Sequence, residues 1–133
     1  MILLDTHVLV WCSLDPARLG PKATAAIGRA WSAAELFASA ISFWEVALLV
    51  QRDRLQLDIP VAAWRHQWLS QGLQEQPLDG ALAVAGAELT VLHSDPADRW
   101  IAAGALAAQA TLITADAQLL AWGSQLPRLD ARQ

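Results

Sequence analysis

The chain has 133 residues, a formal net charge of −4 and a hydrophobic fraction of 55%. This length predicts one domain with a sizeable core. The acidic balance argues against a protein that grips nucleic acid through a broad basic face, but not against an enzyme that reaches phosphates through metal ions. The longest apolar run, residues 100–108, falls well short of the roughly 20 residues that a membrane span needs.

The start of the chain and its cysteine content indicate a reducing compartment. No cation precedes Arg18, so the basic start of a signal peptide is missing, and the single cysteine, Cys12, cannot form an internal disulfide. We therefore expect a cytoplasmic protein with no membrane association. The high hydrophobic fraction further predicts that some apolar surface is buried against a partner.

The first half of the chain alternates short apolar runs with helical patterns. In chain order we expect a strand at 2–4, a helix directly after it, a helix at 22–31, a strand at 36–41 and a helix from 42 to about 52. Pro21 at an N1 position opens the second of these helices. Ser42 and Glu45 form a Ser-x-x-Glu capping box that is typical of a helix start.

The second half continues the alternation. We expect a helix from residue 60, a helix at 80–89, an ambiguous short segment at 90–92, a helix at 97–108, a strand at 111–114, a short helix after 116 and an edge strand at 128–130. Asp79 and Asp95 are the expected N-caps of the helices at 80–89 and 97–108. Strands that alternate with helices predict an α/β fold with a mostly parallel central sheet and helices on both faces.

Four carboxylates stand where the chain leaves a strand or enters a helix. They are Asp5, Glu45, Asp98 and Asp116. In an open α/β sheet such ends converge on one crevice, and a cluster of like charges is costly there unless a cation neutralises it. Mg²⁺ and Mn²⁺ prefer hard oxygen ligands of this kind, so the pattern predicts a divalent-metal site and phosphodiester chemistry.

Each acid taken alone is better explained as a helix cap, as half of a capping box or as a partner of a helix dipole than as a metal ligand. The conjunction of all four favours the metal site, and the hydroxyls of Thr6, Ser42 and Thr114 are expected to support its ligands. Asp95 is better explained as a helix cap than as a ligand. Whether Arg99, next to Asp98, contacts phosphate or only the surface stays open.

Four short motifs together resemble one known family. They are Asp5-Thr6 near the N-terminus, Ser42-x-x-Glu45, the segment His93-x-Asp95-Pro96-x-Asp98-Arg99-x-Ile101-Ala102-Ala103, and Leu112-Ile113-Thr114-x-Asp116. In this order and spacing they resemble the PIN-domain family, and within it the VapC-type toxins. The resemblance extends from Asp5 to about Leu129, with Ala97 where members often carry an aromatic residue.

The resemblance implies a single PIN-like nuclease domain over residues 1–133. It also implies an endoribonuclease that depends on Mg²⁺ or Mn²⁺ and cleaves RNA phosphodiester bonds. Such a protein is the toxin of a type II toxin–antitoxin module, usually dimeric and inhibited by a cognate antitoxin. Matched position by position, the family's catalytic and metal-binding acids fall on Asp5, Glu45, Asp98 and Asp116.

Two other functions compete with this one. A phospho-receiver domain also places acids at strand ends, but it needs a lysine after a late strand and the only lysine here, Lys22, lies early. A catalytically silent PIN-like binding module would be expected to have lost one of the four acids. The tryptophans are predicted to lie in the core or an interface, with Trp64 and Trp68 against a partner helix, and the histidines are predicted to be structural, with His7 beside Asp5 as the best exception.

Overall fold

The computed structural model describes residues 1–90, 92, 95–122 and 125–133. Its centre is a five-stranded sheet in the order β3-β2-β1-β4-β5, in which every neighbouring pair is parallel. The strands are β1 (Ile2–Leu4), β2 (Leu36–Ser39), β3 (Gln74–Gln76), β4 (Thr111–Thr114) and β5 (Arg128–Asp130). The predicted α/β fold with a parallel sheet is confirmed, and β5 lies at an edge as expected.

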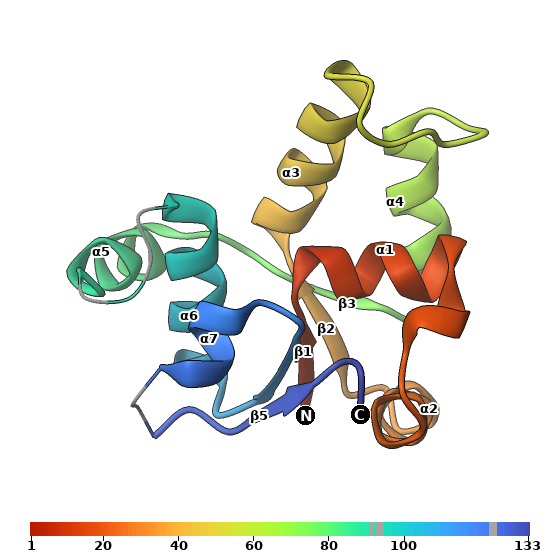
Figure 1. Cartoon of the computed structure of the whole chain (residues 1–133). Coiled ribbons are helices and arrows are strands. Elements are labelled where there is room, and N and C mark those ends of the chain that lie inside the picture. Colours follow the sequence, from red (N-terminus) through yellow and green to blue (C-terminus); the bar gives the residue numbers. More distant parts are fainter. Residues whose placement is uncertain (91, 93–94, 123–124) are drawn as a thin grey trace.

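Helices cover both faces of this sheet (Figure 1). They are α1 (Thr6–Leu14), the 3-10 helix η1 (Pro16–Arg18), α2 (Pro21–Ser32), α3 (Ala40–Gln51), α4 (Val61–Ser70), α5 (Gly80–Glu88), α6 (Pro96–Ala108) and α7 (Ala117–Ala121). Helices α1 to α4 contribute to one hydrophobic cluster, and α6 and α7 contribute to a second one on the other face.

The central strand β1 shows how the sequence fills both faces. Leu3 and Leu4 are both buried, and because successive side chains of a strand alternate, they enter different clusters. Leu4 packs on the side of Ile113, whereas Leu3 packs on the side of Leu112 and Ile101. Burial on both faces explains why β1 is a short continuous apolar run.

The start of α3 differs from the sequence-based prediction. The N-cap is Ser39, whose side chain accepts a hydrogen bond from the Ile41 amide at 3.2 Å, and the helix begins at Ala40. The predicted capping box at Ser42 and Glu45 is therefore wrong, and the strand ends at residue 39 rather than 41. Because Ser39 already serves the first amides, Ser42 lies inside the first turn and its hydroxyl contacts Thr6 instead.

Strand β3 was not predicted. Its three residues are polar and it lies at the sheet edge, so it carries no apolar alternation. Glu75 at its centre accepts two hydrogen bonds from Arg65 of α4, at 2.7 and 2.8 Å. In the ambiguous segment 90–92, Thr90 and Leu92 lie in turns, while residue 91 is outside the described residues.

The order of the strands positions a site. From β1 the chain adds β2 and β3 on one side and later β4 and β5 on the other. In such sheets ligands bind in the crevice beyond the carboxyl ends of the strands where this direction changes, which here is between β1 and β4. Within the described residues, the helices are all too short or too polar to cross a membrane.

Candidate active site

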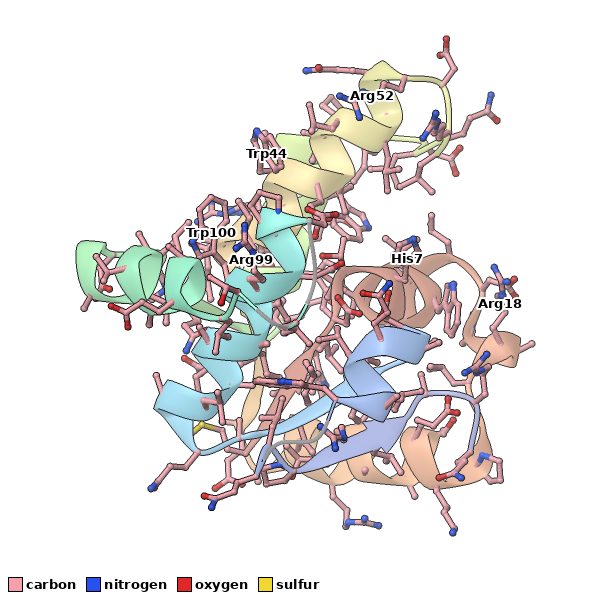
Figure 2. The ribbon with its side chains drawn as sticks, turned by 60° about the vertical axis from the view of Figure 1, so that its left-hand side comes forward. His7, Arg18, Trp44, Arg52, Arg99 and Trp100 are labelled. Atoms are coloured by element: carbon pink, nitrogen blue, oxygen red, sulfur yellow. The ribbon has the colours of Figure 1, made fainter. Side chains whose placement is uncertain are left out.

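A cleft of about 410 Å³ opens beyond the ends of β1 and β4. Its walls are formed by Asp5, His7, Trp11, Arg18, Glu45, Asp95, Asp98, Ala115, Asp116 and Arg132. All four acids singled out from the sequence line this cleft, although they come from four different parts of the chain. His7 of α1 and Arg18 of η1 line the same side of the cleft (Figure 2).

Asp5 follows β1 directly and is held by hydrogen bonds on both carboxylate oxygens. Its Oδ1 accepts from the Thr6 amide at 2.8 Å and its Oδ2 accepts from the Thr114 hydroxyl at 2.6 Å. Its side chain is only 4% exposed, and this burial raises the pKa of Asp5 despite the two hydrogen bonds, which act to lower it. The charged form of Asp5 is therefore costly in the metal-free protein.

Glu45 reaches the cleft from the second turn of α3. The Thr6 hydroxyl donates to Glu45 Oε1 and also lies 2.9 Å from the Ser42 hydroxyl. Because a hydroxyl has one proton, Ser42 acts as the donor to Thr6 when Thr6 donates to Glu45. Partial burial raises the pKa of Glu45, and the negative charges of Asp5 and Asp95 raise it further.

Asp95 and Asp98 reach the cleft from the start of α6. Asp95 Oδ1 accepts from the Ala97 amide at 3.0 Å, so Asp95 is the N-cap of this helix, as predicted. Its carboxylate also belongs to a group with Glu45 and Asp98 in which one oxygen from each residue lies within 4.8 Å of the others. Asp95 is therefore both the N-cap of α6 and a lining residue of the cleft.

Asp116 lies beyond β4 and caps α7. Its Oδ1 accepts from the amides of Gln118 and Leu119, both at 2.9 Å, and its own amide donates to the Thr114 hydroxyl at 3.0 Å. Thr114 thus connects Asp116 with Asp5. Asp116 lines the cleft but is not in the group of Glu45, Asp95 and Asp98 found among the described residues.

The donor set suits a small divalent cation. Two ligand oxygens at opposite sides of a Mg²⁺ ion are about 4.2 Å apart, since each lies about 2.1 Å from the ion. Adjacent ligands of such an ion are closer, at about 3.0 Å. The oxygens of Glu45, Asp95 and Asp98 are within 4.8 Å of one another, so these side chains would have to move closer together for one ion to be held by all three. All three are carboxylates, the ligand type that hard cations prefer.

Sequence reasoning gave the acids but not the cations around them. Arg18 lines the cleft with its guanidinium 4.7 Å from the centre of the Trp11 ring, a cation–π contact that a linear reading of the sequence does not reveal. Arg132 also lines the cleft and pairs with Asp130 at 3.0 Å. Arg99, by contrast, is not among the lining residues of the cleft and lies next to Trp100 (Figure 2).

The interface prediction for Trp64 is wrong. Trp64 is 4% exposed, its ring packs edge-to-face on Phe43 and Trp68, and its indole donates to the Ser13 hydroxyl at 2.9 Å. Trp68 is partly buried and also packs on Trp31. These rings belong to the core because they contact Ser13 of α1, Trp31 of α2 and Phe43 of α3 within the same chain. His93, part of the PIN-like motif, lies outside the described residues.

Comparison with known proteins places the chain in a family. A PIN domain model matches residues 2–122. A curated relative, ribonuclease VapC22 from Mycobacterium tuberculosis, is 38% identical over 119 residues, which are 89% of this chain and 88% of that protein.

Solved structures show the same fold. In VapBC2 from Rickettsia felis bound to a promoter DNA fragment, one chain superposes with a TM-score of 0.68 at 19% identity, covering 97% of this chain and 98% of that one. A toxin–antitoxin complex from Klebsiella pneumoniae matches with a TM-score of 0.63 at 18% identity and 95% coverage of both chains. With the sequence match over nearly the whole length, the chain belongs to the PIN domain family.

Proposed function

We propose that this protein is an endoribonuclease that depends on Mg²⁺ or Mn²⁺ and acts as the toxin of a type II toxin–antitoxin pair. The observation that carries the proposal is the group of Glu45, Asp95 and Asp98 in the cleft that Asp5 and Asp116 also line. Support comes from the relative that is 38% identical and named a ribonuclease.

The cleft requires a positive charge before it can receive RNA. Five carboxylates line it, and a phosphodiester placed among them would be repelled. A bound divalent ion would offset part of the negative charge of the carboxylates, polarise a phosphate oxygen and lower the pKa of an attacking water. We assign Asp5, Glu45, Asp98 and Asp116 to hold this ion, with Asp95 as a fifth candidate.

The hydroxyls set the directions of the carboxylates. Thr114 fixes Asp5, and Thr6 together with Ser42 fixes Glu45, so both acids are oriented before a metal arrives. Ligands held in this way need less reordering on binding. Arg18, held over Trp11 at the rim, supplies a positive charge for a neighbouring phosphate of the strand.

The competing functions have less support. A silent binding module does not explain why every acid of the motif set lines one cleft. A phospho-receiver needs a lysine at the site, and Lys22, in the first turn of α2, is not among the residues that line the cleft. The proposal therefore remains a nuclease.

We further propose that the protein works in the cytoplasm, forms a homodimer and is inhibited by a cognate antitoxin. The structural neighbour from Klebsiella pneumoniae supports the antitoxin, since it is a toxin–antitoxin complex. Sedimentation velocity at high micromolar concentration tests the dimer, because monomeric behaviour there contradicts it. Copurification with the product of a neighbouring short gene tests the antitoxin.

Cleavage of single-stranded RNA by the metal-depleted protein tests the nuclease proposal. We expect no cleavage in excess EDTA and full cleavage after Mn²⁺ or Mg²⁺ is restored. An Asp98→Asn protein purified in the same way controls for contaminating nucleases. Cleavage in EDTA that the Asp98→Asn protein lacks would show a metal-independent nuclease and overturn the proposed mechanism.

A further inference from the structure

Beside the acidic cleft lies a second cavity of about 370 Å³, which we call the aromatic pocket. Its apolar walls are Ile41, Trp44, Leu78, Pro96, Ala97 and Trp100, and its edge is Asp95. The volume is at the lower end of the roughly 300–1,000 Å³ typical of small-ligand sites. The pocket lies where the first turns of α3 and α6 meet.

One wall of the aromatic pocket is held in place from behind. The Trp100 indole donates to the Ala83 carbonyl of α5 at 3.2 Å. Its ring lies against Gly86, where a Cβ atom would overlap the indole, so a glycine is needed for this contact. Trp100 is therefore fixed in orientation and needs little ordering to receive a ligand.

The other aromatic wall is exposed. Trp44 is 53% exposed and immediately precedes Glu45 on α3. Successive residues of an α-helix differ by about 100° in direction, so one turn of helix presents Glu45 to the acidic cleft and Trp44 to the aromatic pocket. Figure 2 shows Trp44 and Trp100 on the same side of the molecule, on neighbouring helices.

Two features connect the aromatic pocket with RNA. Asp95 lines both cavities, so they adjoin at the start of α6. On the other side of Trp100, Arg99 carries a positive charge, and its Nε atom is buried with no hydrogen-bond partner among the described residues. Acids that hold a metal, an aromatic pocket and a cation thus follow one another along a single surface.

We propose that the aromatic pocket binds one nucleobase of the RNA strand next to the phosphate that is cleaved. This inference rests on the proposed nuclease function. Every base has a π face, and stacking on aromatic side chains is how proteins hold single strands without a fixed sequence. RNA is favoured over a protein helix as the occupant because the strand must cross the acidic cleft to be cleaved, and that cleft adjoins this pocket at Asp95.

The test measures RNA binding separately from cleavage. In an Asp98→Asn background, with the Mn²⁺ concentration raised until the weakened metal site is saturated, a labelled short single-stranded RNA is titrated by fluorescence anisotropy. We expect Trp44→Ala to weaken binding roughly 5- to 150-fold, and Trp44→Phe to restore most of it because a ring remains. Leu14→Ala removes an exposed side chain of α1 that lines neither cavity and serves as the matched control.

An abasic series decides what the pocket holds. Each RNA of the series lacks the base at a different position. We expect one position at which the missing base weakens binding to the Asp98→Asn protein. At that position the missing base should have no further effect on binding to the Asp98→Asn, Trp44→Ala double variant. Additive losses at every position would overturn the proposal. So would a Trp44→Ala protein with unchanged RNA affinity, and in that case a shift from dimer to monomer in sedimentation would identify the pocket as an interface between copies.

The two proposals fail in different ways. If the wild type binds RNA through Trp44 but does not cleave it with any divalent metal, the nuclease proposal fails, and the pocket is a base-binding site with no cleaved phosphate beside it. If the wild type cleaves RNA and the Trp44→Ala variant cleaves it with the same kcat/KM, the nuclease proposal stands and the base pocket fails.

Discussion

The hydroxyl of Thr114 donates a 2.6 Å hydrogen bond to Oδ2 of Asp5, across 109 residues of sequence. Both residues are buried at the ends of the paired strands β4 and β1. The same hydroxyl accepts the Asp116 amide at 3.0 Å, so its proton is directed at Asp5. Thr114 thus orients the carboxylate of Asp5 and also holds the backbone amide of Asp116.

We expect Thr114→Val to shift the acid limb of the pH–rate profile to higher pH. The Thr114 hydrogen bond lowers the pKa of Asp5, which burial raises, so its removal raises that pKa further. If the ionised form of Asp5 is active, more alkaline conditions are then needed for half-maximal kcat/KM. Valine preserves the shape of the side chain and removes only the hydroxyl.

Thr24→Val, in the exposed first turn of α2, is the matched control and should leave the profile unchanged. An unchanged profile in a folded Thr114→Val protein would contradict a role of Asp5 as a charged site residue.

We expect Asp5→Asn and Asp98→Asn each to reduce RNA cleavage by about 10²–10³, since the loss of a carboxylate that holds the metal ion weakens the ion's stabilisation of the developing negative charge by about 3–4 kcal/mol. Asp58→Asn changes an exposed acid outside the cleft and should cleave like the wild type. Circular dichroism checks that each variant is folded. Cleavage within a few-fold of wild type in either site variant would remove that residue from the site.

A pair of substitutions separates the two roles of Asp95. Asparagine caps a helix about as well as aspartate, so Asp95→Asn should keep the stability of α6 and lose only a charge near Glu45 and Asp98. Asp95→Ala should in addition cost about 1 kcal/mol of unfolding free energy.

Mn²⁺ affinity should fall in both Asp95 variants, as measured by calorimetric titration. Asp79→Ala, which removes the N-cap of α5 away from the cleft, should cost similar stability with no change in Mn²⁺ affinity. If the Asp95→Asn variant binds Mn²⁺ as tightly as the wild type, Asp95 acts only as the helix cap.

Stability in the presence of a chelator should fall as the pH rises above about 4. Burial raises the pKa of Asp5 and of Glu45 above their ordinary values of 3.8 and 4.5. Between the ordinary pKa of each acid and its raised pKa in the folded state, the folded state binds more protons than the unfolded state. The free energy of unfolding therefore decreases as the pH rises through this range. The stabilisation that each protonated acid provides is lost above its pKa in the folded state.

Asp5→Asn should have a flatter pH dependence, because its amide stays neutral in both states. Glu75 and Asp130, whose pKa values are lowered by their arginine partners, contribute in the opposite direction at lower pH and are the same in both proteins. Urea unfolding from pH 4 to 8 measures this difference. If the free energy of unfolding changes with pH in the same way in both proteins, ionisation of Asp5 does not destabilise the folded state.

Much of this fold could be predicted from local sequence because its elements carry strong signals. The apolar runs predicted the bounds of β1 and β4 to within one or two residues. The N-caps Asp79 and Asp95 did the same for the starts of α5 and α6. Strand β3 could not be found in this way, since its residues are polar and it forms only by pairing with β2 and by the contact of Glu75 with Arg65.

The site was less accessible to sequence reasoning than the fold. The sequence picked out the acids at strand and helix ends, and the structure brings them to one cleft. The shift of the α3 cap from Ser42 to Ser39 could not be foreseen, because both serines suit a cap and only the contact with Thr6 distinguishes them. The aromatic pocket also depends on how α3 and α6 pack, which local patterns do not specify.

Mn²⁺ binding followed by thermal unfolding tests most directly whether the acidic cleft holds a metal. A ligand that binds only the native state at about 100 times its dissociation constant adds about 2.7 kcal/mol, so saturating Mn²⁺ should raise the melting temperature of the wild type by several degrees. Asp58→Asn should show the same shift and Asp98→Asn a much smaller one. Equal metal-induced shifts in all three proteins would show that the ion binds elsewhere and would contradict the assignment of Asp98 as a ligand.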